Sequence, residues 1–251
     1  MKLIGIDSSG LVASVAIMEN DKLVAEYTIN NKKTHSQTLL PMLEEIVKNA
    51  GLEMKEIDAI AIAAGPGSFT GLRIGAATAK GLGLALKKPI VAVSTLDALA
   101  YNLYGTDSLV CPIMDARRNQ VYTGIYEFVS EDTECNSETK NGGLFGKYGL
   151  NIIKEPCAVP IEEIADALNA LNREVIFLGD GVPVFAEQLQ NLMKVSYSFA
   201  PGHLRLQKAG CVASLGIEKF RAGICEDAAE HSPEYLRLSQ AERERKEAGL
   251  L

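Results

Sequence analysis

A glycine-rich segment, IAAGPGSFTGLRIGAATAKGLGLAL from Ile62 to Leu86, constrains the fold more than any other part of the chain. An apolar strand runs into a tight Gly-Pro-Gly turn, after which Ser68 and Thr70 can cap the helix that follows. The dinucleotide fingerprint fails at its third glycine, and Gly71 is followed by Leu72 where a Walker loop needs lysine. The segment therefore predicts a strand, a turn and a helix that match neither phosphate-loop template.

Within this helix, small residues recur at every fourth position: Gly71, Gly75, Ala79 and Gly83. Residues four apart share one helix face, and glycine inside a helix costs about 1 kcal/mol relative to alanine. A face without side chains lets another backbone approach closely. The pattern leaves two interpretations open, packing on the protein's own sheet and contact with another protein.

The order of predicted elements is repeated in the two halves of the chain. Residues 2–29 predict an antiparallel meander of three strands, followed by a helix after His35, a strand around Ile60, the glycine-striped helix, and a strand and short helix at 88–104. The second half opens with a strand ending at Asp115, a polar turn and another strand, and after a polar loop gives helix, strand, helix, a short extended piece and a longer helix. This repeat predicts a duplicated α/β domain.

Charge and aromatic content restrict the partners that the chain can bind alone. The 251 residues include 25 basic and 32 acidic ones, a net charge of −7, which argues against gripping a polyanion except through a local basic patch. Aromatic residues make up 6% and tryptophan is absent, so a stacking platform for single-stranded nucleic acid is poorly supported. The charged run at 241–247 is typical of a solvated helix or tail.

Cysteine usage and hydropathy indicate a cytoplasmic protein. The five cysteines form no Cys-x-x-Cys pair and suit a reducing compartment. The longest uncharged apolar stretch, 59–72, is too short for a membrane span, which needs about 20 apolar residues, and no secretory signal pattern is present. We therefore expect no membrane association.

Asp7 with Ser8 and Ser9 forms the best candidate for polar chemistry. A carboxylate and two hydroxyls at a strand end can hold a hydrated magnesium ion and a phosphate, although an aspartate in a turn commonly bonds only its own backbone. Asp115 and Asp180 favour a nucleotide slightly, since a duplicated fold would place Asp7 and Asp115 across an interdomain cleft.

Other chemistry finds little support in the sequence. The three histidines, His35, His203 and His231, include no pair at helical i, i+4 spacing, so no metal ligands are predicted. No residue is assigned a catalytic role. Arg117 and Arg118 could reach a phosphate, but a solvated position on a hairpin tip is the favoured interpretation.

Six segments together resemble the bacterial TsaB family, also called YeaZ: IGIDSS, HSQTLLPML, GPGSFTGLRIGAATAKGLGLAL, VSTLDALA, DARRNQVYTGIYE and PEYLR. The resemblance covers nearly the whole chain and is weakest at about 131–193. It implies a duplicated actin/Hsp70/sugar-kinase-like fold (ASKHA, ribonuclease H-like) of two α/β domains. The N-terminal domain, 1–105, would carry the partner-binding helices, followed by a C-terminal domain at 106–230 and a C-terminal segment at 231–251.

The resemblance also implies a function in making N6-threonylcarbamoyladenosine at position 37 of tRNAs that read codons beginning with A. In that pathway TsaD carries the metal and transfers the threonylcarbamoyl group, a TsaB-like subunit binds and activates TsaD, TsaE joins the complex, and TsaC supplies the activated intermediate. TsaD's His-x-x-x-His ligand pair is absent here, where only His35 stands near the matching helix start. A non-catalytic subunit without an intrinsic cofactor is therefore expected, with tRNA reached only through the complex.

The resemblance places the partner surface on the helix after His35 and on the glycine-striped helix. It would be used by TsaD and, in its absence, by a second copy of the chain in a homodimer, and ATP or ADP at this interface is left open. The residues so implied are His35, Leu39, Leu43, Gly71, Arg73, Gly75, Ala79 and Gly83. The alternative is a nucleotide-dependent ASKHA enzyme, an ATPase or phosphotransferase using Asp7, Ser8 and Asp115.

Overall fold

The computed structural model describes residues 1–31, 33–130 and 148–237. The N-terminal half contains β1 (Lys2–Asp7), β2 (Ala13–Glu19), β3 (Lys22–Ile29), α1 (His35–Asn49), η1 (Met54–Glu56), β4 (Ala59–Gly65), α2 (Phe69–Leu86), β5 (Ile90–Ser94), α3 (Thr95–Ala100) and η2 (Tyr101–Leu103). The second half contains β6 (Leu109–Asp115), β7 (Gln120–Ser130), β8 (Tyr148–Pro160), α4 (Ile161–Leu171), β9 (Val175–Leu178), α5 (Val182–Leu192), β10 (Tyr197–Phe199) and α6 (Ala209–Arg221).

The two five-stranded sheets have the same topology. The first has the order β3-β2-β1-β4-β5, with antiparallel pairing up to β1 and parallel pairing beyond it. The second, β10-β9-β6-β7-β8, repeats this arrangement with β6 in the place of β1. The predicted duplication is therefore confirmed, and the second sheet also contains β8, a strand that the sequence pattern did not predict.

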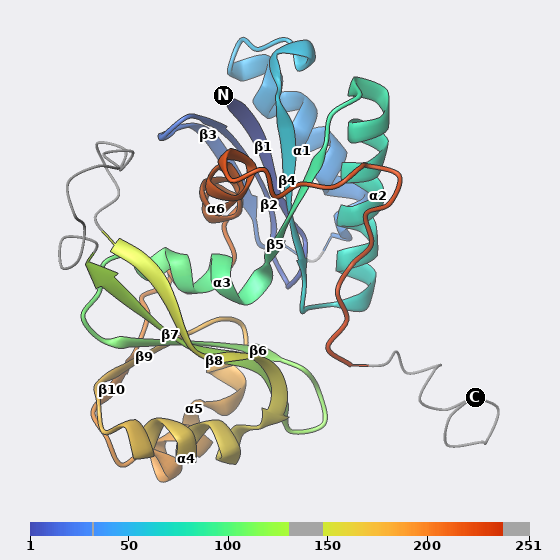
Figure 1. Cartoon of the computed structure of the whole chain (residues 1–251). Helices are drawn as coiled ribbons and strands as arrows, with labels where there is room; N and C mark the ends of the chain where they lie inside the picture. Colours follow the sequence, from blue (N-terminus) through green and yellow to red (C-terminus); the bar gives the residue numbers. More distant parts are fainter. Residues whose placement is uncertain (32, 131–147, 238–251) are drawn as a thin grey trace.

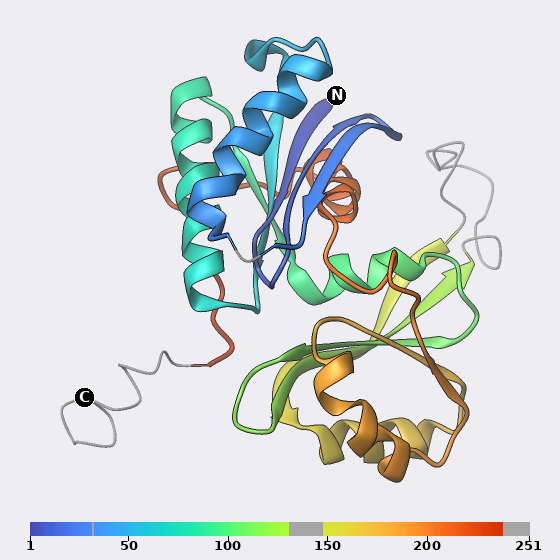
Figure 2. The same ribbon diagram turned by 180° about the vertical axis from the view of Figure 1, so that it is seen from behind.

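Helices cover both faces of the first sheet (Figure 1; Figure 2). Because side chains alternate along a strand, Ile4 and Ile6 pack toward α1 and α2, in one core with Leu39 and Ile46. Leu3 points to the opposite face and packs with Val212 and other residues of α6. In the second sheet, α4 and α5 pack on one face around Phe177.

Helix α6 lies inside the range 106–230 predicted for the C-terminal domain, yet it packs on the N-terminal sheet. The approach is close because both surfaces carry small residues: a Cβ on Gly216 would stand 2.5 Å from Ala61 Cβ, and one on Gly5 would overlap the Ala209 carbonyl. The chain thus returns to its first sheet after completing the second. A division by sequence order alone does not describe this helix.

Helix α3 joins the two sheets. Its residues Leu96 and Leu99 are fully or almost fully buried in a core with Val110 and Tyr126 of the second sheet, while Ala98 packs with the first. The Tyr126 hydroxyl donates a hydrogen bond of 2.9 Å to Asp97 Oδ1. The two halves therefore share a packed region around α3.

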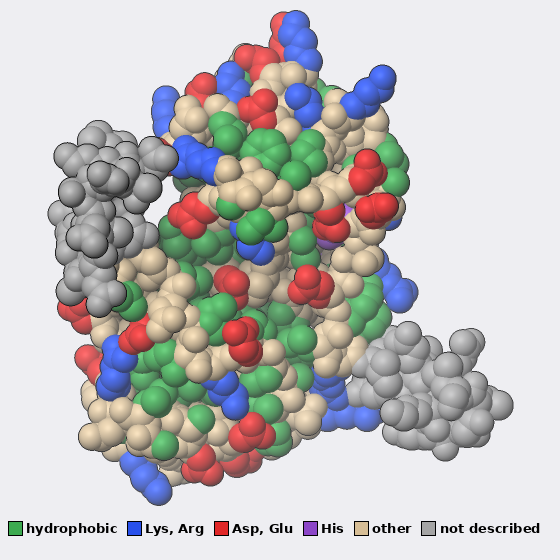
Figure 3. Space-filling model, viewed as in Figure 1, with side chains coloured by type: hydrophobic (Ala, Val, Ile, Leu, Met, Phe, Trp, Pro, Cys, Tyr) green, Lys and Arg blue, Asp and Glu red, His purple; other side chains and the backbone are tan. Residues whose placement is uncertain are grey.

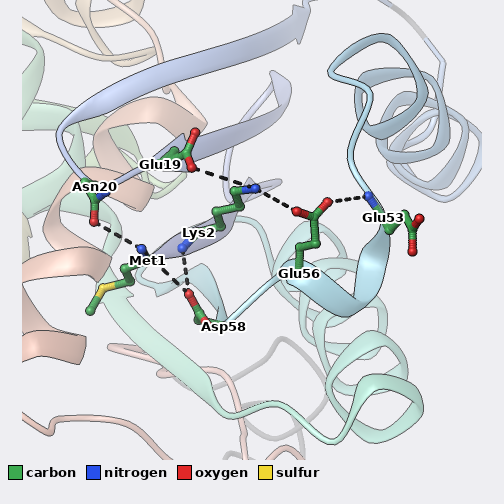
Figure 4. Close-up of polar contacts among 7 residues, drawn as sticks. All are labelled: Met1, Lys2, Glu19, Asn20, Glu53, Glu56 and Asp58. Carbon is green, nitrogen blue, oxygen red and sulfur yellow. Dashed lines mark hydrogen bonds and ion pairs between the residues drawn. The ribbon is translucent and has the colours of Figure 1, made fainter.

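A polar network fixes the start of β1 (Figure 4). The Lys2 backbone N–H donates to Asp58 Oδ2 at 2.8 Å, and its Nζ lies 2.9 Å from Glu56 and 3.8 Å from Glu19. Exposed ion pairs of this kind stabilise a fold by less than about 1 kcal/mol each. Their consequence is mainly geometric, since they connect β1 to the β2–β3 turn and to the segment before β4.

The glycine stripe of α2 faces its own sheet. A Cβ on Gly71 would overlap the Ser8 carbonyl oxygen, one on Gly75 would overlap Ser8 Oγ, and one on Gly83 would stand 2.6 Å from Ala228 Cβ. Ala79, Leu39 and Leu43 are also buried in the core of the chain. Six of the eight residues proposed for partner binding therefore pack internally, and the interpretation of the stripe itself as a docking face is corrected to internal packing.

Gly75→Ala is expected to destabilise the fold by about 1–3 kcal/mol, because the added methyl would overpack the contact with Ser8 and lie 3.1 Å from Ile62 Cδ1. Gly81 is the matched control: it lies on the exposed side of the same helix with no atom within 4 Å of an added Cβ. Gly81→Ala should therefore gain up to about 1 kcal/mol from helix propensity. Urea unfolding measures both, and a Gly75→Ala protein as stable as the parent would contradict the internal role.

Candidate functional site

A cleft of about 680 Å³ lies between the two sheets, where strand ends and turns from both halves meet. The N-terminal half supplies the turn after β1 and the start of α2, and the second half supplies the β6–β7 turn and the loop before α5. The lining residues are Ser9, Gly10, Leu11, Gly67, Ser68, Phe69, Thr70, Met114, Asp115, Ala116, Arg117, Arg118, Tyr122, Asp180, Val184 and Arg237. This cleft is the one that the repeat of strands ending in aspartate predicts.

Asp7 lies behind the cleft wall and does not line it. Its Oδ1 accepts hydrogen bonds from Ser9 N at 2.9 Å and Ser9 Oγ at 2.6 Å, while Oδ2 is buried and has no hydrogen-bond partner among the described residues. Burial raises the pKa of Asp7 to about 6, against the lowering effect of the Ser9 hydrogen bonds. Asp7 therefore forms hydrogen bonds within its own turn, which is the second of the two interpretations of the sequence.

The turn after β1 is held directly against the start of α2. Ser8 Oγ donates to the Gly71 carbonyl at 2.9 Å, and the Ser68 N–H donates to the Ser9 carbonyl at 2.7 Å. Gly67 is required in this contact because a Cβ there would overlap the Ser9 carbonyl. Of the predicted nucleotide-binding residues in this turn, only Ser9 reaches the cleft surface.

Two aspartates of the second half line the cleft. Asp115 is half-buried and forms an ion pair of 3.0 Å with Arg117, whose backbone N–H it also accepts at 2.7 Å. Asp180 Oδ1 accepts from the Asp115 N–H at 3.3 Å. Burial raises the pKa of Asp180 to about 6, and the charge of Asp115 adds to this rise. The negative charge of the cleft therefore lies mainly on its second-sheet side.

The β6–β7 turn carries Arg117 and Arg118 on the cleft rim. Arg117, Arg118 and Asn119 have φ angles of 64°, 57° and 57°, three consecutive left-handed residues. The predicted hairpin-tip position is observed, with the Arg117 side chain 84% exposed. Both arginines also line the cleft, a placement that the hairpin pattern alone does not specify.

A C-terminal strap, defined here as residues 226–237, runs from the edge of β5 along α2 to the cleft (Figure 1). Its first part is anchored by the Lys80 amine, which donates to the His231 carbonyl at 2.9 Å, and by a 2.6 Å contact between His231 Nδ1 and Glu226. The Glu234 N–H then donates to the Ala64 carbonyl at 2.8 Å. The strap thus extends the N-terminal half after α6.

The end of the strap joins the two halves of the cleft. The Tyr235 ring stacks on Phe69 at the start of α2, with centroids 4.1 Å apart and planes 4° from parallel. Arg237 donates hydrogen bonds to the carbonyls of Ala116 and Arg117 in the β6–β7 turn. The segment PEYLR therefore connects α2 to the opposite rim, an interaction that the sequence analysis missed because its partners lie more than a hundred residues away.

Among the residues that the structure describes, no three His, Cys, Asp or Glu side chains gather in a group able to hold a metal ion. Within residues 1–31, 33–130 and 148–237, no helix has the length and apolar character to cross a membrane.

Comparison with known proteins identifies the family. A family model described as TsaD: tRNA N6-adenosine threonylcarbamoyltransferase matches residues 22–245. The tRNA threonylcarbamoyladenosine biosynthesis protein TsaB of Bacillus subtilis is 32% identical over 96% of both chains, and that of Escherichia coli is 34% identical over 96% of both. The chain belongs to the TsaB family.

The solved structure of YeaZ from Pseudomonas aeruginosa agrees with this assignment. It matches with a TM-score of 0.71 and 28% identity, over 94% of this chain and 99% of that one. The fold of two α/β domains with repeated sheet topology implied by the resemblance is therefore confirmed for this TsaB-family chain, and so is its connection with threonylcarbamoyladenosine biosynthesis.

Asp7→Asn is expected to change the pH dependence of stability. The folded pKa of about 6 lies above the unfolded value of 3.8, so the contribution of Asp7 to stability is complete below about pH 4 and is lost as the pH rises through 6. Asparagine cannot ionise, so the variant should gain on the order of 2–3 kcal/mol relative to the parent between pH 4 and pH 7. Urea titrations at both pH values measure this, and a difference independent of pH would contradict the buried, ionisable state.

Arg237→Ala is expected to destabilise the protein by about 1–3 kcal/mol, because two backbone carbonyls of the β6–β7 turn lose a charged donor. Arg237→Lys should restore only part of this, since lysine lacks the forked donor geometry. Arg221→Ala removes an exposed pair with Asp21 and serves as control, with an expected change below about 1 kcal/mol. Thermal and urea unfolding compare the three, and equal effects of the two alanine variants would mean that the strap does not join the halves.

Proposed function

We propose that this TsaB-family chain is a non-catalytic subunit that binds and activates TsaD in the complex that forms N6-threonylcarbamoyladenosine on tRNA. The coarser assignment to threonylcarbamoyladenosine biosynthesis rests on the family. The finer one rests on two features of the structure, the outer surface of α1 and α2 and the condition of the cleft.

The observation that carries the proposal is an exposed apolar face on α2. The residues opposite the buried stripe are Arg73, Ala77, Gly81 and Leu84, all exposed. Leu84 is 57% exposed, and on the neighbouring helix Leu40 is 56% exposed. Both helices cover the same face of the first sheet (Figure 2). Leu40 and Leu84 thus expose apolar surface on two adjacent helices, and apolar surface left exposed can serve to bind a protein partner.

This surface replaces the glycine stripe as the proposed docking face. TsaD would bind it in the complex, and a second copy of the chain would bind it in a homodimer when TsaD is absent. Of the residues implied by the family resemblance, Arg73 is exposed at the start of α2, where its Nε donates to the Tyr235 hydroxyl, whereas His35 is half-buried with Nε2 2.9 Å from the Gly10 carbonyl. TsaE would join the assembled pair, and tRNA would be reached through the complex.

The side chains that line the first-sheet side of the cleft support a non-catalytic role. Phosphoryl transfer needs groups that grip the phosphates and a residue that orients the nucleophile. Asp7 is buried with Oδ1 occupied by Ser9, and Ser8 bonds the backbone of α2. Neither side chain is presented to the cleft, so the set expected for a phosphotransferase is incomplete on the first-sheet side.

The size of the cleft favours a second candidate, a nucleotide-dependent ASKHA enzyme. About 680 Å³ lined by Asp115, Asp180 and hydroxyl groups is enough to hold a nucleotide. In the TsaB-type proposal, ATP or ADP would bind at or near the interface with the partner. Turnover of ATP by the purified chain alone distinguishes the two candidates, since the non-catalytic subunit should show none.

Leu84→Glu is expected to weaken TsaD binding by roughly tenfold or more, because it places a charge in the apolar docking face. Leu171→Glu is the matched control: Leu171 ends α4 and is 37% exposed on the second half. In a mixture of TsaC, TsaD, TsaE, threonine, bicarbonate, ATP and tRNA, omission of the chain should abolish the modified nucleoside, Leu84→Glu should lower it strongly, and Leu171→Glu should not.

Mass spectrometry of the tRNA nucleosides gives the product yield, and size-exclusion chromatography gives heterodimer formation. Circular dichroism confirms that both variants are folded. Full product without the chain, or product from the chain and TsaC without TsaD, would overturn the proposal.

A further inference from the structure

We propose that this chain supplies an RNA contact of its own at the cleft rim, where Arg118 binds a phosphate and the Tyr235 ring stacks with a base of the tRNA held by the complex. The inference rests on the proposed function, since the chain's net charge of −7 makes binding of tRNA by the isolated chain weak. The contact surface, called here the arginine rim, consists of Arg73, Arg117, Arg118, Arg237 and Tyr235.

The backbone of the β6–β7 turn points to a use for the Arg118 side chain. Left-handed geometry costs a residue other than glycine roughly 1–2 kcal/mol, and Arg117 and Arg118 adopt it consecutively. Glycine would form this turn with less strain. Arg117 compensates through its ion pair with Asp115. Arg118 is exposed and makes no hydrogen bond or ion pair with any described residue, so its guanidinium is free for a ligand.

An aromatic pair stands across the cleft from Arg117 and Arg118, at the start of α2. Tyr235 stacks in parallel on Phe69, which lines the cleft, and remains 39% exposed. The Arg73 Cζ lies 5.2 Å from the Phe69 ring centroid and 6.0 Å from that of Tyr235, and its Nε donates to the Tyr235 hydroxyl at 3.2 Å. A ring held rigidly by a second ring and a cation is a suitable platform for an unpaired base, because stacking needs little further ordering.

Basic and acidic side chains both stand at the rim, and they differ in burial. Figure 3 shows acidic and basic side chains mixed over the face that carries both sheets. The rim carries four arginines against three nearby acids, Asp115, Asp180 and Glu234, of which only Glu234 is exposed. Forked guanidinium groups beside an exposed ring match the phosphate and base of RNA better than they match an acidic protein surface, which offers no base to stack.

The experiment measures tRNA binding by the assembled complex of this chain with TsaD and TsaE at several salt concentrations. Arg118→Glu should raise the Kd for tRNA by roughly three- to tenfold. It should also reduce the magnitude of the slope of log K against log salt by about 1. Arg118→Gly, which relieves the left-handed strain, should weaken tRNA binding less while unfolding no more easily than the parent. Tyr235→Leu should raise the Kd for tRNA with little change in its dependence on salt concentration.

Lys194→Glu is the matched control, because it makes the same change in net charge. Lys194 precedes β10 and Arg118 follows β6; these strands run in the same direction, so the two residues lie at opposite ends of the sheet. Equal tRNA Kd values for Arg118→Glu and Lys194→Glu would overturn the proposal. Weaker heterodimer formation by Arg118→Glu in the absence of tRNA would also overturn it, because it would indicate a protein contact. A change in ATP binding by the chain alone, without a change in tRNA binding by the complex, would overturn it as well. Failure of the proposed function would instead appear as absence of the TsaD complex itself.

Discussion

The contact between the β1–β2 turn and the start of α2 is the constraint on which the rest of the structure depends. Ser8 and Ser9 meet Gly67, Gly71 and Gly75 at a distance that no side chain could occupy. This contact closes the first-sheet wall of the cleft and places Asp7 behind it. The glycines thus bring two backbone segments into contact in this wall and leave no space for a side chain between them.

The same contact determines what the outer surface of α2 can be. With the small residues turned inward, the positions between them turn outward, so the exposed face is composed of Ala77, Gly81 and Leu84. The helix is held at its start by the Ser68 cap and the Tyr235 ring, and along its side by the bond from Lys80 to the strap. A helix fixed in this way presents its outer face without further ordering, which favours binding because less conformational freedom is lost on association.

Sequence patterns were sufficient for the repeated order of elements, because β1 and β6 are apolar runs that end in aspartate, β2 and β7 alternate, and the turns between them are polar. They were insufficient for β8, whose run NIIKEPCAVP mixes charge, proline and apolar residues without alternation and pairs through register shifts. The four-residue spacing of glycines predicted a close approach correctly but not its partner, since inward and outward packing leave the same pattern. Helix α6 and the strap depend on contacts distant in sequence, which local patterns do not encode.

The strap gives the two halves of the cleft a connection that the shared core of α3 does not provide at the rim. Tyr235 is fixed to α2 through Phe69, and two residues later Arg237 is fixed to the β6–β7 turn. The proposed docking helix and the proposed RNA-binding turn are therefore joined by a path of three residues. A partner that binds α2 can change the conformation of the rim only if it binds one conformation of these three residues more tightly than another. Because the strap contacts both elements directly, such a difference would act on the β6–β7 turn at Ala116 and Arg117, next to Arg118, the residue that we assign to the tRNA phosphate.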